Sequence, residues 1–153
     1  MASRPGRRRC DPRAVESRPS ADLGNNSEIL CADMPSVGTA TAHGLAAMYN
    51  AVLQGTLMDS ARLAELSALA FEGVDRVFGN PARMALGFPI GRIGAPAEEN
   101  SVAFGWPGGG GSYAYADAPR GVAFALTKTR PVPNFDTALS VTTILADHLA
   151  RTR

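Results

Sequence analysis

The sequence has 153 residues, which is long enough for one ordinary domain and too short for two. Hydrophobic residues make up 45% of the chain and its mean hydropathy is −0.04, so the composition is that of a globular protein. No apolar run approaches the roughly 18 residues that a membrane-spanning helix requires, and the sequence therefore predicts no transmembrane segment.

The net charge of +1 conceals an uneven distribution, because residues 1–18 hold six arginines against Asp11 and Glu16. Basic arms of this kind bind nucleic acid or anionic membranes in some proteins. No aromatic residue interleaves these arginines, however, and they show no amphipathic period. We therefore expect residues 1–22 to be a disordered or non-native segment and expect no nucleic-acid partner.

The N-terminal region also lacks the features of a secretory signal. Its arginine-rich start is followed by polar sequence instead of an apolar core, so the default location is the cytoplasm. Cys10 and Cys31 show neither Cys-x-x-Cys nor Cys/His spacing, which predicts free thiols instead of a disulfide or a metal site. We expect no cofactor.

Helical periodicity begins after residue 38. Thr39 or Thr41 is placed to cap a helix that ends at Gln54-Gly55 and whose apolar positions recur at helical spacing: Leu45, Met48, Tyr49 and Val52. A second helix is predicted from Asp59 or Ser60 to the vicinity of Glu72-Gly73, with an apolar face of Leu63, Leu66 and Leu69.

The period then changes to two, which predicts strands. The first predicted strand alternates over Met84, Leu86, Phe88 and Ile90, with Pro89 indicating an edge or a bulge. Three further strands follow, containing Val102 to Trp106, Tyr113 to Tyr115 and Gly121 to Thr127. The last of these is apolar on both faces, as in a strand covered on both sides.

A final helix is predicted to begin at Asp136, with one face formed by Ala138, Val141, Leu145, His148 and Leu149. The β-branched residues between 141 and 144 are weaker helix formers. Taken together, the elements predict an α/β (α+β) fold: helices, then a three-stranded antiparallel meander, then a C-terminal helix.

The most informative segment contains four consecutive glycines, Gly108 to Gly111, between two predicted strands. Glycines let a backbone approach a ligand closely or adopt positive φ. With Trp106 and Pro107 before them, they resemble the third active-site motif of the serine β-lactamase and penicillin-binding-protein superfamily, in its class C-like branch with the esterases. The resemblance extends from Leu23 to the C-terminus and includes residues 32–36, so residues 23–153 are expected to form part of a transpeptidase-like domain.

This resemblance implies roles for three residues. Gly109, the residue after the motif, would donate its backbone N–H to the oxyanion hole of an acyl-transfer reaction. Gly108 would leave the backbone accessible to a substrate carbonyl. Trp106 stands where the family most often has Lys or His, and since tryptophan occurs at this position in esterase-like members, it favours ester over β-lactam or peptide substrates.

The other two motifs of the family do not occur in the sequence. The only lysine, Lys128, is preceded three positions earlier by Ala125, so there is no Ser-x-x-Lys, and there is no Tyr-x-Asn or Ser-x-Asn. A serine nucleophile requires a neighbouring base. The resemblance therefore implies the C-terminal part of a serine hydrolase acting on a small ester or amide, inactive alone and prone to self-association through an exposed strand edge.

Simpler interpretations stay open at this point. The glycines are also typical of a flexible hairpin loop, Trp106 of a core aromatic, and the whole chain of a non-catalytic binding or structural domain. A nucleotide-binding loop is disfavoured, because Gly111 stands where the phosphate-binding lysine belongs. His43 and His148 lie in no metal-ligand spacing and are interpreted as structural.

Overall fold

The computed structural model describes residues 20–31, 39–77, 79–96 and 102–151. The chain divides into two compact units between Ala40 and Thr41. The described part of the first unit contains two short helices, α2 (Ala21–Gly24) and α3 (Ser27–Leu30). The arginine-rich segment up to residue 19, Cys10 and the family-like residues 32–36 lie outside the described residues, so the predictions made for them are untested.

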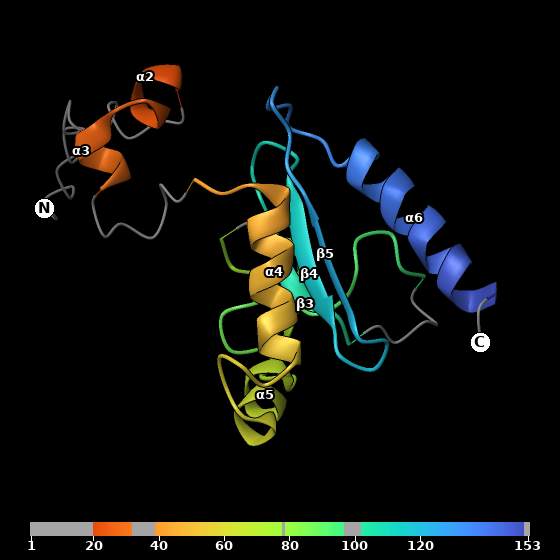
Figure 1. Ribbon diagram of the computed structural model, residues 1–153. Helices are drawn as coiled ribbons and strands as arrows, with labels where there is room; N and C mark the ends of the chain where they lie inside the picture. Colours follow the sequence, from red (N-terminus) through yellow and green to blue (C-terminus); the bar gives the residue numbers. More distant parts are fainter. Residues whose placement is uncertain (1–19, 32–38, 78, 97–101, 152–153) are drawn as a thin grey trace, which may run out of the picture. The chain divides into compact units, whose positions relative to one another are not determined.

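The second unit contains the predicted helices and the antiparallel meander (Figure 1). Its first element, α4 (Ala42–Leu53), forms as predicted from its ends. The Thr41 hydroxyl accepts a hydrogen bond from the Gly44 N–H at 3.0 Å, which satisfies one of the free donors of the first turn. Gly55 follows the helix with φ of 73°, the left-handed conformation that favours glycine after a helix end.

The next helix, α5 (Ser60–Ser67), is shorter than the sequence predicts. Asp59 caps it by accepting a hydrogen bond from the Arg62 N–H at 2.8 Å. The predicted end near Glu72-Gly73 is wrong, because residues 71–74 form strand β1 (Phe71–Val74) instead. This strand pairs antiparallel with β2 (Pro81–Met84), so long-range strand pairing ends the helix before the local apolar pattern does.

The strand predicted over residues 84–90 is also corrected. Strand β2 ends at Met84, and the chain then bends through Gly87, whose φ is 88°. The Ala85 N–H donates to the Phe88 carbonyl at 2.8 Å and closes this turn. The alternation in the sequence therefore spans a bend, which a period-two pattern does not reveal.

The central sheet is a meander in the order β3-β4-β5, as predicted. Its strands are β3 (Phe104–Pro107), β4 (Tyr113–Asp117) and β5 (Val122–Leu126). In the antiparallel register Trp106 lies opposite Ala114, and Ala114 lies opposite Ala125. Because alternate residues face opposite sides of a sheet, small alanines line one face and the tyrosines with Phe124 line the other.

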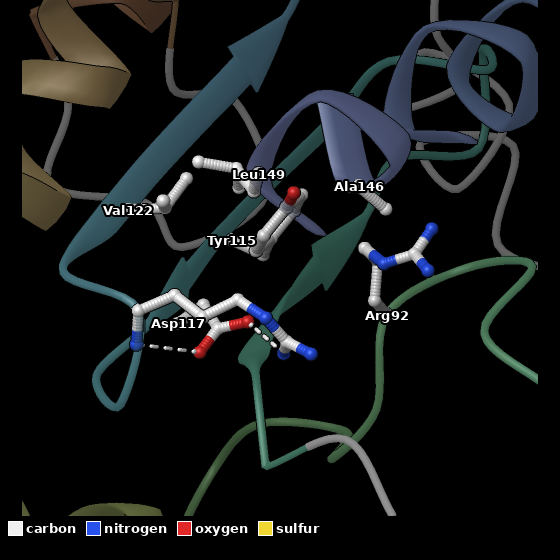
Figure 2. A pocket seen from close by; sticks show the side chains of 7 residues that line it. Arg92, Tyr115, Asp117, Val122, Ala146 and Leu149 are labelled. Carbon is white, nitrogen blue, oxygen red and sulfur yellow. Dashed lines mark hydrogen bonds and ion pairs between the residues drawn. The ribbon is translucent and has the colours of Figure 1, made fainter. Parts of the chain in front are cut away.

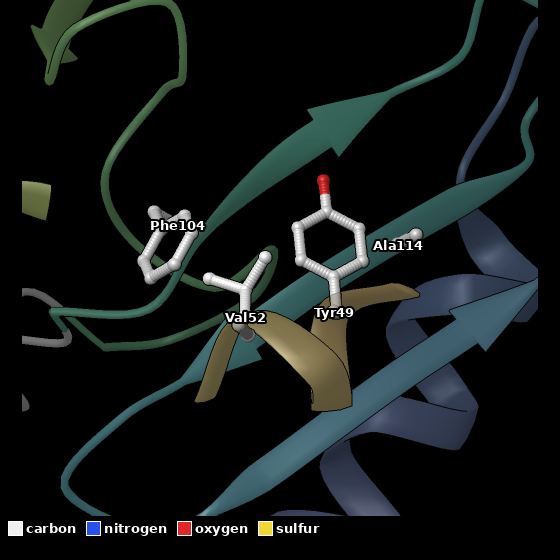
Figure 3. Close-up of a cluster of buried hydrophobic side chains, with 5 residues drawn as sticks. Tyr49, Val52, Phe104 and Ala114 are labelled. Atoms are coloured by element: carbon white, nitrogen blue, oxygen red, sulfur yellow. The ribbon is translucent and has the colours of Figure 1, made fainter. Parts of the chain in front are cut away.

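Each face packs against one helix. On the alanine face, Tyr49 and Val52 of α4 form a buried cluster with Phe104 and Ala114 (Figure 3). The opposite face packs Tyr113 and Tyr115 against Ala138 of the final helix α6, and the two helices lie on either side of the sheet (Figure 1). The expectation that β5 is covered on both sides is confirmed.

Helix α6 (Asp136–Arg151) forms over the predicted residues but presents a different face. Its buried residues are Ala138 and Thr142, whereas Val141 and His148 are exposed, which corrects the predicted face. The Thr142 hydroxyl is satisfied by the Ala138 carbonyl at 2.8 Å, which lets a polar residue occupy the core position that the sequence assigned to Val141.

Candidate functional site

The glycine run forms the tight turn that joins β3 to β4. The Gly108 N–H donates to the Ser112 carbonyl at 2.8 Å, and the Gly111 N–H donates to the Gly108 carbonyl at 2.9 Å. Gly111 has φ of 83°, so the turn ends in a left-handed residue, as three-residue hairpin loops commonly do. The hairpin interpretation of the glycines is therefore correct as geometry, and it leaves their chemical role open.

The turn is hydrogen-bonded to the segment that leads from β5 to α6. The Val132 N–H donates to the Gly110 carbonyl at 3.1 Å, and the Lys128 N–H donates to the Ser112 hydroxyl at 3.1 Å. A side chain at Gly111 would collide with the Asn134 and Val132 carbonyls and with the Lys128 amino group. These contacts hold one side of the turn against the protein, and sequence reasoning did not anticipate them because they join residues about 20 positions apart.

Gly109 is placed differently from its neighbours. It is exposed, and a β-carbon added to it meets no atom within 4 Å. Among the described residues, none accepts a hydrogen bond from the Gly109 N–H. An exposed backbone donor held by a braced turn is the arrangement that an oxyanion hole requires, since such donors must be oriented before the charge develops.

The Trp106 side chain is 55% exposed, although it lies on the same sheet face as the buried Phe104. It therefore does not occupy the core position that the simpler interpretation gave it. The apolar surface of its ring is available beside the turn, and an indole supplies no positive charge to bind a carboxylate.

Tyr49 lies beneath this end of β3 and was not among the predicted site residues. Burial raises the pKa of Tyr49 above its ordinary value, and a hydrogen bond with the backbone of Trp106 lowers it in part. The sequence shows Tyr49 only as one more apolar position of a helix.

A small pocket lies on the α6 side of the sheet, between Arg92, Tyr115 and Leu149 (Figure 2). It encloses about 10 Å³, which is the space of a single water molecule and too little for an ester substrate. The buried Asp117 beside it accepts hydrogen bonds from the Arg120 N–H at 3.2 Å and from the Arg120 guanidinium at 2.8 Å. This pair closes the β4–β5 turn and is a structural element.

The two histidines lie on different helices, His43 in the first turn of α4 and His148 in the last turn of α6, and both are exposed. Within residues 20–31, 39–77, 79–96 and 102–151, no three His, Cys, Asp or Glu side chains are grouped to hold a metal ion. In that same part of the chain no helix is both long enough and apolar enough to span a bilayer.

The chain as a whole is similar in sequence to a known protein family. Residues 4–147 match the Beta-lactamase family. The esterase/beta-lactamase LipL of Mycobacterium tuberculosis (strain ATCC 25618 / H37Rv) is 33% identical over 114 residues, which cover 72% of this chain and 27% of LipL.

Two solved structures are similar in fold and in sequence. A penicillin-binding protein homolog from Caulobacter crescentus is 30% identical with a TM-score of 0.55, over 63% of this chain and 28% of that protein. EstA from Arthrobacter nitroguajacolicus Rue61a is 25% identical with a TM-score of 0.65, over 86% of this chain and 38% of EstA. The chain thus spans between 27% and 38% of the length of these relatives.

Proposed function

Because this chain belongs to the Beta-lactamase family, we propose that it supplies the oxyanion-hole side of a serine hydrolase site that cleaves an ester or an amide. The observation that carries this proposal is the exposed Gly109 N–H, which follows Trp106-Pro107-Gly108 directly and has no acceptor among the described residues.

The reaction assigns Gly109 one defined task. A serine oxygen attacks the substrate carbonyl carbon, a carbon–oxygen bond forms, and the carbonyl oxygen takes up the negative charge. The Gly109 N–H donates to that oxygen and stabilises the tetrahedral intermediate. The intermediate collapses, the leaving alcohol or amine departs with a proton, and water then hydrolyses the acyl-serine and releases the acid.

Gly108 and Trp106 shape the space in front of this donor. Gly108 is partly buried and carries no side chain that would obstruct the approach of a carbonyl group. Trp106 presents an exposed apolar ring without charge, which suits an ester with an apolar substituent better than a substrate with a carboxylate. The name of the relative LipL, esterase/beta-lactamase, includes an esterase activity.

The nucleophile and its base are supplied from outside these residues in the proposal. Ser-x-x-Lys and Tyr-x-Asn do not occur in the 153 residues, so no serine here has a lysine or tyrosine placed by motif to take its proton. We therefore expect the chain by itself to show no serine-dependent hydrolysis, and to contribute to catalysis once a segment with those motifs completes the fold.

Covalent labelling tests this proposal. The purified chain, alone and co-expressed with a segment that carries the two missing family motifs, is incubated with a serine-reactive phosphonate and a nitrophenyl ester. We expect one labelled serine and ester hydrolysis in the complex only. Stoichiometric labelling of a serine in the chain alone, or a folded complex that neither labels nor hydrolyses, would contradict it.

A further inference from the structure

Ser112, the residue that follows the glycine run, forms hydrogen bonds through two of its groups. Its backbone carbonyl accepts from the Gly108 N–H at 2.8 Å, which closes the turn. Its side-chain hydroxyl accepts from the Lys128 N–H at 3.1 Å, across 16 positions of the sequence. Alanine at position 112 would leave the Lys128 N–H without that acceptor in partly buried surroundings.

The hydrogen bond to Lys128 lies beyond the end of the paired strands. The register of β4 and β5 ends at the pair formed by Tyr113 and Leu126, and Lys128 lies two residues further along the chain. The hydroxyl group of Ser112 therefore continues the connection between the two segments, with a side-chain oxygen as the acceptor.

The segment that begins at Lys128 contacts the turn again at Val132, whose N–H donates to the Gly110 carbonyl at 3.1 Å. Ser112 and Gly110 flank Gly111, and the carbonyl groups of Asn134 and Val132 lie where a β-carbon of Gly111 would be. Gly111 is buried, and both of its neighbours are hydrogen-bonded to the segment that covers it. The turn is therefore held from both sides of Gly111.

Gly111 in turn sets the direction of the Gly109 N–H. The Gly111 N–H donates to the Gly108 carbonyl at 2.9 Å. That carbonyl group and the Gly109 N–H belong to one peptide unit, which is planar, and in a trans unit the C=O and the N–H point in opposite directions. Because the carbonyl points toward Gly111, the N–H of the exposed Gly109 is directed away from the interior of the turn.

We propose that Ser112 is a positioning residue, whose hydroxyl group fixes the turn to the backbone of Lys128 so that the Gly109 N–H keeps one direction. Without this hydroxyl group, residues 111 and 112 could move together, and the peptide unit that carries the Gly109 N–H would change its orientation. The catalytic consequence rests on the proposed function, whereas the hydrogen bond to Lys128 is a property of the chain alone.

The sole lysine of the chain makes this hydrogen bond observable. Labelling with lysine that carries nitrogen-15 at its α-amino group gives one backbone proton–nitrogen signal, that of Lys128. In the variant Ser112→Ala we expect this signal to move upfield and its proton to exchange faster with deuterium, because the proton loses an acceptor. Ser112→Thr keeps a hydroxyl group and should restore both properties.

Ser140→Ala is the matched control. It also removes a serine hydroxyl group that is hydrogen-bonded to the backbone, to the Asp136 carbonyl at 2.9 Å, but on the exposed surface of α6. An unchanged Lys128 signal in Ser112→Ala, or the same shift in Ser140→Ala, would overturn the proposal. Where Ser112→Ala does not fold in buffer, it is compared with the parent in trimethylamine N-oxide, which favours the folded state.

The active complex tests the positioning role. Ser112→Ala should lower kcat by up to about 10²-fold with little change in KM, since the substrate still binds while the oxyanion donor is misplaced. Ser112→Thr should retain most of the parent kcat. A shifted Lys128 signal with an unchanged kcat in Ser112→Ala would overturn the positioning role. An inactive parent complex would contradict the proposed function, while the Lys128 signal would still decide the hydrogen bond.

Discussion

The four consecutive glycines meet different requirements of the fold. Gly111 combines φ of 83° with carbonyl groups close to the place where its β-carbon would lie. Gly109 has open space at the corresponding place, and its φ is not in the left-handed region. The backbone conformation and the neighbouring atoms of this chain therefore require glycine at position 111 but not at position 109.

This difference predicts unequal effects of alanine. Gly111→Ala should lower the free energy of unfolding by about 2 kcal/mol, since it adds left-handed strain and a steric conflict. Gly109→Ala should change stability by roughly 0.5 kcal/mol or less. Urea unfolding of the two variants and the parent, followed by Trp106 fluorescence, measures both values. Equal losses would contradict the assigned turn geometry.

Tyr113 predicts a dependence of stability on alkaline pH. Burial, the largest cause, raises the pKa of Tyr113 to about 12, while its ordinary value in an unfolded chain is 10.0. The folded state thus holds the proton more tightly, so this contribution is complete below pH 10 and is lost between about pH 10 and 12. Stability should fall over that window, by up to about 1.36 kcal/mol per pH unit for one group.

In the variant Tyr113→Phe, the free energy of unfolding should decrease less steeply above pH 10, while its pH dependence below 10 stays unchanged. The measurement is urea unfolding at a series of pH values between 8 and 12. An identical slope in parent and variant would show that Tyr113 does not titrate in this way, and the remaining slope in the variant would include the contribution of Tyr49, whose pKa is raised by burial as well.

Among the helices and strands, the sequence predicts correctly those whose ends are marked by capping or turn residues. Helix α4 has a capping threonine and a terminating glycine, and the meander has turns at Gly108–Gly111 and at Asp117–Gly121, so both were predictable. Strand β1 was not, because its partner β2 lies beyond a turn and the preceding apolar spacing fits a helix. Tertiary pairing overrode the local pattern there.

The face of α6 shows the same limit. Leu145 and Leu149 are partly buried as predicted, but the helix is rotated so that Thr142 is buried and Val141 is not. Hydropathy alone disfavours a buried threonine. The carbonyl of Ala138 satisfies its hydroxyl, which only the three-dimensional structure reveals.

Strand β5 predicts association of the isolated chain. It lies at the end of the order β3-β4-β5, and no described strand pairs with its outer edge. Its residues, Val122 to Leu126, are all apolar, and an unpaired apolar edge is a template for another strand. We expect the sedimentation coefficient to rise with concentration in the micromolar range. A monomer at all concentrations with a sharp cooperative melt would favour the non-catalytic, self-standing domain instead.

In the second unit as a whole, the two faces of the central sheet pack against different helices. Its alanine face packs Phe104 and Ala114 against Tyr49 of α4, while its aromatic face packs Tyr113 and Tyr115 against α6. The glycine turn and the family of the chain were recognisable in the sequence. The exposure of Trp106, the free Gly109 N–H and the brace from residues 128–134 depend on contacts between distant residues and were not.

If the Gly109 N–H stabilises the oxyanion, as proposed, the kcat of the active complex depends on this donor, and the variant Gly109→Pro tests that dependence. Proline removes this N–H, and the loss of one such donor typically lowers kcat by about 10²–10³-fold. Gly109→Ala keeps the N–H and fits the open space, so it should retain most of the parent activity. A Gly109→Pro complex as active as the parent on the same ester would show that Gly109 is not the oxyanion donor.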